Sequence, residues 1–341
     1  ILETRERTGR QCRVTFNYRY SPPRTQVKDL LMSGVIGQVL SVDFHWMLDT
    51  FHGADYFRRW HSYKSQSGGL MVHKATHHFD LVNWWLATVP ESVSAMGHRR
   101  FYTPAMADRF GLAQRAARCL DCPEAHRCAF HLDLRNLKGL NAYYLQNEKY
   151  DGYIRDRCVF RPDIEIEDSI VATVRYKNGA QLSYSLNAFT SWEGYLVVFN
   201  GSKGRLEHKC EEQVYVSGEG ANPGALKPEG TWIKIYPLFE PAYDVAIWDA
   251  EGGHGGADPL MLRDIFVPDA GKDTYGRAAD QRAGAYSILC GIAANRSMAL
   301  KRAVDIQELV PEIPVPDYPP MRGEAEAIPK PARRRKTWLF E

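Results

Sequence analysis

The alternation of apolar and polar positions predicts a chain built largely from strands joined by short turns. In residues 168–176 and 180–188 every second residue is apolar, and the Asn178–Gly179 pair between them suits the positive φ of a tight hairpin. Strands that follow one another through tight turns favour a mostly antiparallel sheet. The same alternation predicts further strands at 194–200, 204–209, 213–216 and 231–236.

Other segments surround this block of strands. Helical spacing of apolar residues, with glycine stops, predicts helices at 24–34, 69–87, 258–267 and 275–302. Strand chemistry returns at 11–20, 37–48 and 91–102. Two segments lack a clear period: an insertion at 103–160 that carries four of the seven cysteines, and a Pro-rich, extended tail at 311–341.

Composition narrows the function classes. The 341 residues are 44% hydrophobic and 25% charged, with a net charge of +2, which is typical of a globular protein and gives no electrostatic case for nucleic acid. No apolar run reaches the length of a membrane span. The chain starts at Ile1 inside an apparent helix end, so we expect an upstream segment. We expect a cytoplasmic protein, with an export signal left open.

Six segments, taken in order, resemble the Gfo/Idh/MocA oxidoreductases over roughly residues 10–310. They are VTFNYRYSPP, LLMSGVIGQVLSVDFHW, SGGLMVHKATHHFDLVNWWL, VRYKNGAQLSYSLNAF, NGSKGRLE and GIAANRSMALKRAVDIQELV. The resemblance implies an N-terminal Rossmann domain for NAD or NADP and a C-terminal domain. That second domain is α+β: a large, predominantly antiparallel open sheet flanked by helices, similar to the C-terminal domain of glyceraldehyde-3-phosphate dehydrogenase.

On this resemblance residues 1–20 are a remnant of the Rossmann domain. Residues 21–310 form the substrate and oligomerisation domain, and 311–341 form the tail. No G-x-G-x-x-G turn occurs in the chain, and the family's Glu-Lys-Pro lysine would lie upstream of Ile1. We therefore expect the isolated chain to bind NAD(H) weakly and to be inactive, and the complete protein to be a homo-oligomer.

The resemblance implies hydride transfer between nicotinamide and a sugar, cyclitol or related polyol. Two alternatives remain open. One is an NAD-dependent glycosidase of the same superfamily, in which transient oxidation enables elimination of the glycoside. The other is a non-catalytic sugar-binding or scaffold protein.

The helix at 69–87 carries the candidate catalytic residues. The family's Asp-x-x-x-His pair maps onto His73 and His77, so a histidine replaces the aspartate. One helical turn separates the two residues, which places both imidazoles on one face, and histidine suits proton transfer near neutral pH. Lys74 could tune the charge or bind a substrate hydroxyl, and Asp80 could orient the His77 ring. A zinc ion on the two histidines is a weaker reading, because H-E-x-x-H is absent.

Candidate binding residues lie elsewhere. His254 sits among four glycines in EGGHGGADP, a segment that the resemblance makes substrate-facing, and Asp258 opens the next helix. Trp60 is a candidate sugar platform, although packing is the commoner role. Asn17 and Arg19 are candidate cofactor contacts at the domain junction, with strand-end hydrogen bonding as the alternative.

The insertion suggests a metal centre. Cys119, Cys122 and Cys128 follow C-x2-C-x5-C spacing, and Cys158 comes thirty residues later. Four thiolates around one zinc ion would make a closed structural site. Two disulfides and an iron–sulfur cluster are the alternatives. For zinc, we expect the four sulfurs within about 4 Å of one another.

Overall fold

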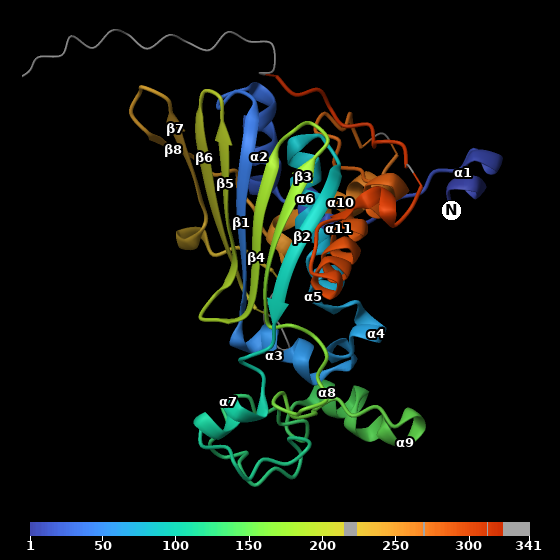
Figure 1. Cartoon of the computed structure of the whole chain (residues 1–341), viewed down its shortest axis with the longest axis vertical. Helices are drawn as coiled ribbons and strands as arrows, with labels where there is room; N and C mark the ends of the chain where they lie inside the picture. Colours follow the sequence, from blue (N-terminus) through green and yellow to red (C-terminus); the bar gives the residue numbers. More distant parts are fainter. Residues whose placement is uncertain (215–223, 269, 312, 323–341) are drawn as a thin grey trace, which may run out of the picture.

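A mixed nine-stranded sheet forms the centre of the computed structural model, which describes residues 1–214, 224–268, 270–311 and 313–322 (Figure 1). The strand order is β8-β7-β6-β5-β1-β4-β3-β2-β9. The strands are β1 Val39–Asp49, β2 Pro90–His98, β3 Ser169–Tyr176, β4 Gln181–Thr190, β5 Glu193–Gly201, β6 Gly204–Glu212, β7 Trp232–Pro237, β8 Tyr243–Val245 and β9 Val304–Asp305.

The pairing confirms the predicted sheet. β1 lies at the centre, parallel to β4 and antiparallel to β5, and the other described pairs of neighbours are antiparallel. The hairpin between β3 and β4 turns at Asn178–Gly179, where Gly179 has φ 86°. Along β1 the side chains of Phe44 and Trp46 are buried, while those between them face the open side.

Helices cover one face of the sheet and leave the other open (Figure 1). α11 packs on α5 so closely that a Cβ on Gly291 would lie 2.2 Å from the carbonyl oxygen of Met71. The covering helices are α2 Pro22–Ser33, α5 Gly69–His73, α6 Thr76–Leu86, α10 Gly253–Phe266 and α11 Gln281–Leu300. No described helix is long and apolar enough to cross a membrane.

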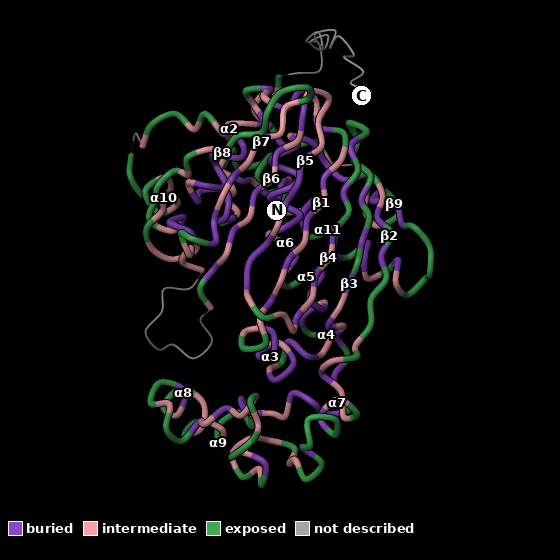
Figure 2. The backbone as a smooth tube through the Cα atoms, turned by 90° about the vertical axis from the view of Figure 1, so that its left-hand side faces the viewer, coloured by how far each residue is buried: buried purple, intermediate pink, exposed green. Residues whose placement is uncertain are grey.

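The 103–160 insertion extends past one end of the sheet, below α3 Thr50–Arg58 (Figures 1 and 2). Asp55 of α3 pairs with Arg155 at 2.7 Å, and the Arg58 guanidinium donates to the Phe130 carbonyl at 2.6 Å. The short helices of the insertion are α7 Pro104–Arg109, α8 Lys138–Tyr143 and α9 Glu148–Asp151. Another short helix, α4 Lys64–Ser67, follows α3 in the chain. The insertion is therefore anchored mainly through α3.

Several predicted elements differ in the structure. The strand expected at 11–20 is wrong: α1 Leu2–Thr8 is followed by a single bridge between Val14 and Ala279 and by the 3-10 helix η1 Asn17–Tyr20. The last long helix begins at Gln281, because the Asp280 side chain accepts from the backbone N–H groups that open it. The strand predicted at 213–216 lies partly outside the described residues, as does the tail beyond 322.

Candidate active site

A break in the predicted helix at 69–87 separates the two candidate histidines. α5 ends at His73 and α6 begins at Thr76, and the Ala75 N–H reaches back five residues to Leu70 at 2.9 Å. This wider turn changes the helical phase, so His73 and His77 face different groups of side chains. The expectation that both imidazoles lie on one face is therefore wrong.

His77 lies against aromatic rings from the N-terminal segment. Its ring centroid is 5.3 Å from that of Tyr18 and 5.7 Å from that of Phe16. The His77 Nδ1 atom is buried and has no hydrogen-bond partner among the described residues. Burial and the nearby Lys74 ammonium lower the pKa of His77 to about 4, so the imidazole is neutral at neutral pH.

His254 approaches the same tyrosine from another part of the chain. Its ring centroid is 6.4 Å from that of Tyr18, and its Nδ1 lies 2.7 Å from an Asp258 carboxylate oxygen. The other Asp258 oxygen accepts from the Asn17 amide at 3.1 Å. His254 itself has φ 50°, a left-handed backbone conformation that is energetically unfavourable for a residue with a side chain. The chain turns sharply at this point.

A buried layer below Tyr18 fixes its position. The Tyr18 hydroxyl donates to Glu212 of β6 at 3.1 Å, and Glu212 also forms an ion pair with Arg24 of α2. The Arg24 guanidinium carbon lies 4.0 Å from the Tyr18 ring centroid, and Arg24 Nη1 donates to the His254 carbonyl at 3.4 Å. Tyr18 is therefore positioned by packing and charge together.

Lys74 occupies the break between α5 and α6. Its ammonium lies 4.8 Å from the Trp46 ring centroid and 3.9 Å from Glu193, which binds His52 at 2.7 Å. Burial disfavours the charge on Lys74, but Tyr56 and Glu193 more than offset this and raise the pKa of its ammonium. The second Glu193 oxygen is buried and has no partner among the described residues.

His73 and Trp60 belong to a neighbouring aromatic cluster. Trp60 stacks on His61 at 3.8 Å, and His73 meets the edge of His61 at 4.2 Å. Tyr56 contacts both histidines and also His52, at 5.2 Å between ring centroids. His73 is exposed and Trp60 is 37% exposed, so this cluster lies at the surface beside the Lys74 group.

Asp80 and Arg19 pair with each other. The Arg19 guanidinium donates to both Asp80 oxygens, at 2.6 and 2.8 Å, and to the Gly276 carbonyl at 3.2 Å. Both side chains are buried. The structure thus places Asp80 against Arg19 and not against the His77 ring. His78 is also buried: it stacks on Trp46 at 4.1 Å, with Nδ1 2.8 Å from the Tyr184 hydroxyl.

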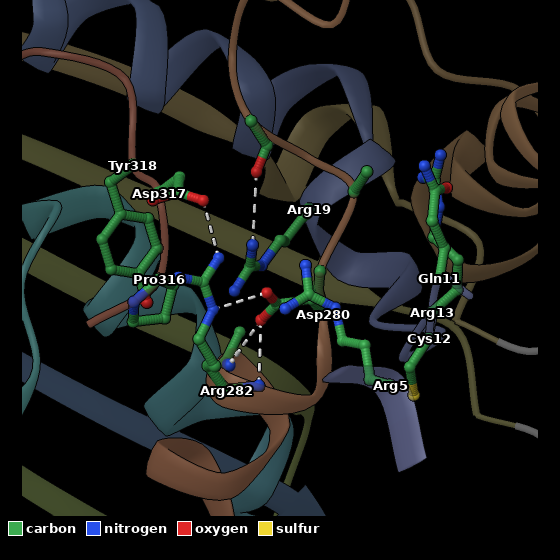
Figure 3. Close-up of a pocket in the computed structure, with 14 residues that line it drawn as sticks. Arg5, Gln11, Cys12, Arg13, Arg19, Asp280, Arg282, Pro316, Asp317 and Tyr318 are labelled. Carbon is green, nitrogen blue, oxygen red and sulfur yellow. Dashed lines mark hydrogen bonds and ion pairs between the residues drawn. The ribbon is translucent and has the colours of Figure 1, made fainter. Parts of the chain in front are cut away.

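Arg19 also lines a pocket of about 260 Å³ between the N-terminal segment, the start of α11 and residues 316–318 (Figure 3). Its arginines are largely neutralised. Arg282 pairs with Asp280 and Asp317, both at 2.7 Å, and Arg13 pairs with Asp264 at 2.8 Å. The pocket therefore offers little free positive charge to an anion.

The four insertion cysteines all border one small cavity of about 20 Å³. All four are free thiols, so the disulfide alternative is wrong for this structure. As the side chains stand, no three His, Cys, Asp or Glu residues in the described ranges are arranged to hold a metal ion. The structure therefore does not show the preformed zinc site that the spacing predicted.

Five residues of this site were not predicted from the sequence: His52, Glu193, Glu212, Arg24 and Tyr18. None lies in a local motif, and Glu193 and Glu212 reach the site only through the order of the strands. Tyr18 stands between Asn17 and Arg19 in FNYRY. Its aromatic position beside two candidate contacts was the one available signal.

Comparisons with known proteins agree with this fold. The family model described as "Oxidoreductase family, C-terminal alpha/beta domain", from the Gfo/Idh/MocA group, matches residues 28–306. YteT of Bacillus subtilis (strain 168), which is named as an oxidoreductase, is 41% identical over 323 residues, covering 91% of this chain and 72% of YteT.

Solved structures share the fold at low identity. A Sinorhizobium meliloti 1021 protein named as a myo-inositol dehydrogenase superposes with a TM-score of 0.50 at 18% identity, over 89% of this chain and 68% of its own. The aldose-aldose oxidoreductase of Caulobacter crescentus, complexed with glycerol, gives 0.52 at 14%, over 89% and 66%. An NAD binding oxidoreductase from Klebsiella pneumoniae gives 0.53 at 14%, over 89% and 68%.

Proposed function

Because the chain belongs to the Gfo/Idh/MocA oxidoreductase family, we propose that it forms the substrate-binding part of an NAD(P)-dependent oxidoreductase acting on a sugar, a cyclitol or a related polyol. The observation that carries the proposal is the neutral His77 imidazole, which lies beside Tyr18 with an unpartnered ring nitrogen. The names of structural neighbours, a myo-inositol dehydrogenase and an aldose-aldose oxidoreductase, support the substrate class.

The residues of this chain fit only the reacting end of such a cofactor. The sequence has no G-x-G-x-x-G turn, and the Arg19 guanidinium is committed to Asp80. The pyrophosphate therefore finds no cradle among these residues. When bound, a nicotinamide ring accepts or supplies the hydride.

The side chains can manage the proton and the developing charge. Oxidation of a secondary alcohol releases the hydroxyl proton as hydride leaves the carbon, and neutral His77 is in the form that accepts it. Lys74, kept charged beside Glu193, would stabilise negative charge on the same oxygen. The unpartnered Glu193 oxygen and the His254–Asp258 pair offer hydrogen bonds to further hydroxyl groups.

The test is a pair of histidine variants in the natural full-length protein. A panel of polyols and aldoses is screened with NAD⁺ and NADP⁺, and the best pair is used for kinetics. His77→Ala should lower kcat on the order of 100-fold, because a positioned base contributes about that much or more. The control is His45→Ala, since His45 lies on the open face of the sheet. Equal kcat for wild type and His77→Ala would reject the role of His77.

One observation favours a second candidate, the NAD-dependent glycosidase. The His254–Asp258 pair places a second acid–base group against the Tyr18 ring, beside His77. Such a pair could protonate a departing glycoside oxygen. Release of a free alcohol from a nitrophenyl glycoside, dependent on NAD⁺ but without net NADH, would select the glycosidase; net NADH with an oxidised sugar would select the dehydrogenase.

We also propose that the open sheet face pairs with another copy of the chain. Leu40, Met96 and Val171 are 53%, 73% and 46% exposed there. Burying such apolar area is a common driving force for homo-oligomers. Light scattering should show an oligomer that Met96→Glu weakens; a monomer at tens of micromolar would reject this arrangement.

A further inference from the structure

The insertion brings four thiols to one point. An isolated bridge between Arg118 and Arg157 sets the two irregular segments around them side by side. The Cys119 N–H donates to the Asp156 carbonyl at 2.8 Å, and the Cys158 N–H donates to the Ala117 carbonyl at 2.9 Å. Cys122 and Cys128 lie in the turns that follow Cys119. As a result all four side chains border the same cavity, although thirty residues separate the last two.

The sulfur atoms share a second feature: each accepts a backbone N–H. Ala116 donates to Cys122 Sγ at 3.4 Å. The other three donors are the N–H groups of Leu132 to Cys119, Phe130 to Cys128 and Phe160 to Cys158. Burial raises the pKa of the Cys119, Cys128 and Cys158 thiols, and these backbone N–H groups offset part of that effect. In metal sites such outer contacts orient the ligands.

The size of the cavity limits what it can contain. Its volume of about 20 Å³ is close to that of one water-sized sphere, for which about 10–15 Å³ suffices. A space of this size accommodates one ion. Arg115 and Arg118 also line the cavity, with their guanidinium groups paired to Asp108 and to Glu148 and Asp156.

Part of the insertion joins the main core through Ala107, Leu112, Val159 and Phe160, and the rest has only a small core of its own. Its own small apolar cluster has three buried residues, Leu132, Leu134 and Leu140. Its described cysteines form no disulfide. A segment with so small a core is the kind that a structural metal stabilises in other proteins.

We propose that Cys119, Cys122, Cys128 and Cys158 bind one thiophilic divalent cation of the zinc class, in a closed four-thiolate site that stabilises the 103–160 insertion. As the side chains stand, no such group in the described ranges is arranged to hold an ion, so binding requires the four sulfurs to turn toward the shared cavity until they reach the ~2.3 Å bonding distance of zinc. The site lies in the insertion, away from His77, and is independent of the proposed oxidoreductase chemistry.

Metal content is the direct test. Protein produced with zinc in the medium and dialysed against metal-free buffer should retain about one zinc per chain, as a closed four-ligand site predicts. Replacement by Co²⁺ should give thiolate-to-cobalt charge-transfer absorption and tetrahedral visible bands. Wild-type protein that retains no metal and gives no such absorption would overturn the proposal, as would iron with acid-labile sulfide.

Variants locate the site and its role. Cys122→Ser should lower zinc content severalfold, whereas Cys12→Ser, outside the cluster, should not change it. Removing zinc from the wild type with a chelator should expose 103–160 to limited proteolysis, with zinc addition restoring protection. Full zinc retention in Cys119→Ser, Cys122→Ser and Cys128→Ser alike would show that the metal lies elsewhere and would overturn the assignment.

Discussion

The buried pair of Arg19 and Asp80 gives the sharpest test of how the site is held. Asp80→Asn keeps the shape of the side chain but removes its charge, which leaves a guanidinium buried without a counter-charge. Breaking a buried ion pair in this way costs about 3–5 kcal/mol. The unfolding entropy of about 2.1 cal/mol/K per residue gives roughly 0.7 kcal/mol/K for 341 residues. The expected fall in Tm is therefore about 4–7 °C.

The assay is thermal unfolding followed by fluorescence, with turnover measured well below Tm. Asp121→Asn is the control, because its ion pair with Arg135 is exposed on both sides and should change Tm by less than about 1 °C. Asp80 is a positioning residue, because its ion pair with Arg19 holds the segment that carries Tyr18 against α6. An Asp80→Asn protein with wild-type Tm and no turnover would refute this positioning role and would indicate that Asp80 takes part in the reaction itself.

Three further outcomes follow from the structure. Lys74→Met removes a cation that lowers the pKa of His77, so the pKa of His77 should rise from about 4. The midpoint of an NMR titration of His77, or the acid limb of kcat/KM, should then move to higher pH; an unchanged midpoint would contradict the interaction between Lys74 and His77. Gly291→Ala should cost about 1–3 kcal/mol in urea unfolding, because the added methyl meets the backbone oxygen of Met71, whereas Gly139→Ala meets nothing within 4 Å and should not. The 341-residue chain should bind NADH only weakly in a fluorescence titration, since it lacks the Gly-rich turn; micromolar binding would place a dinucleotide site within it.

The sheet was accessible from the sequence because its signals are local. Alternation and the Asn178–Gly179 turn predicted β3 and β4 within two residues of their observed ends. The parallel pairing of β1 with β4 has no local signal, since it joins segments about 140 residues apart. The short edge strands β8 and β9 were missed for the same reason: tertiary pairing creates them, with too few residues to show a period.

Only the site residues that stand in a recognisable motif could be predicted from the sequence. His77 and His254 stand in recognisable segments, and the structure brings both against Tyr18. The face on which His73 lies was predicted wrongly because a regular helix was assumed. In the structure the helical turn that ends at Ala75 contains one more residue than a regular turn. Glu193 could not be found, because its role depends on β5 lying beside β1.

The site draws its side chains from η1, α2, α3, the α5–α6 break, α6, β5, β6 and the start of α10, which together span residues 17–258. Its central strand, β1, must wait for β4 and β5 to be synthesised before either edge can pair. During translation no partial chain that ends before Asp258 contains every group. Contacts so distant in sequence form late and slowly. Binding competence should therefore arrive in a single step at the end of folding, so that an incompletely made chain has no opportunity to act on substrate.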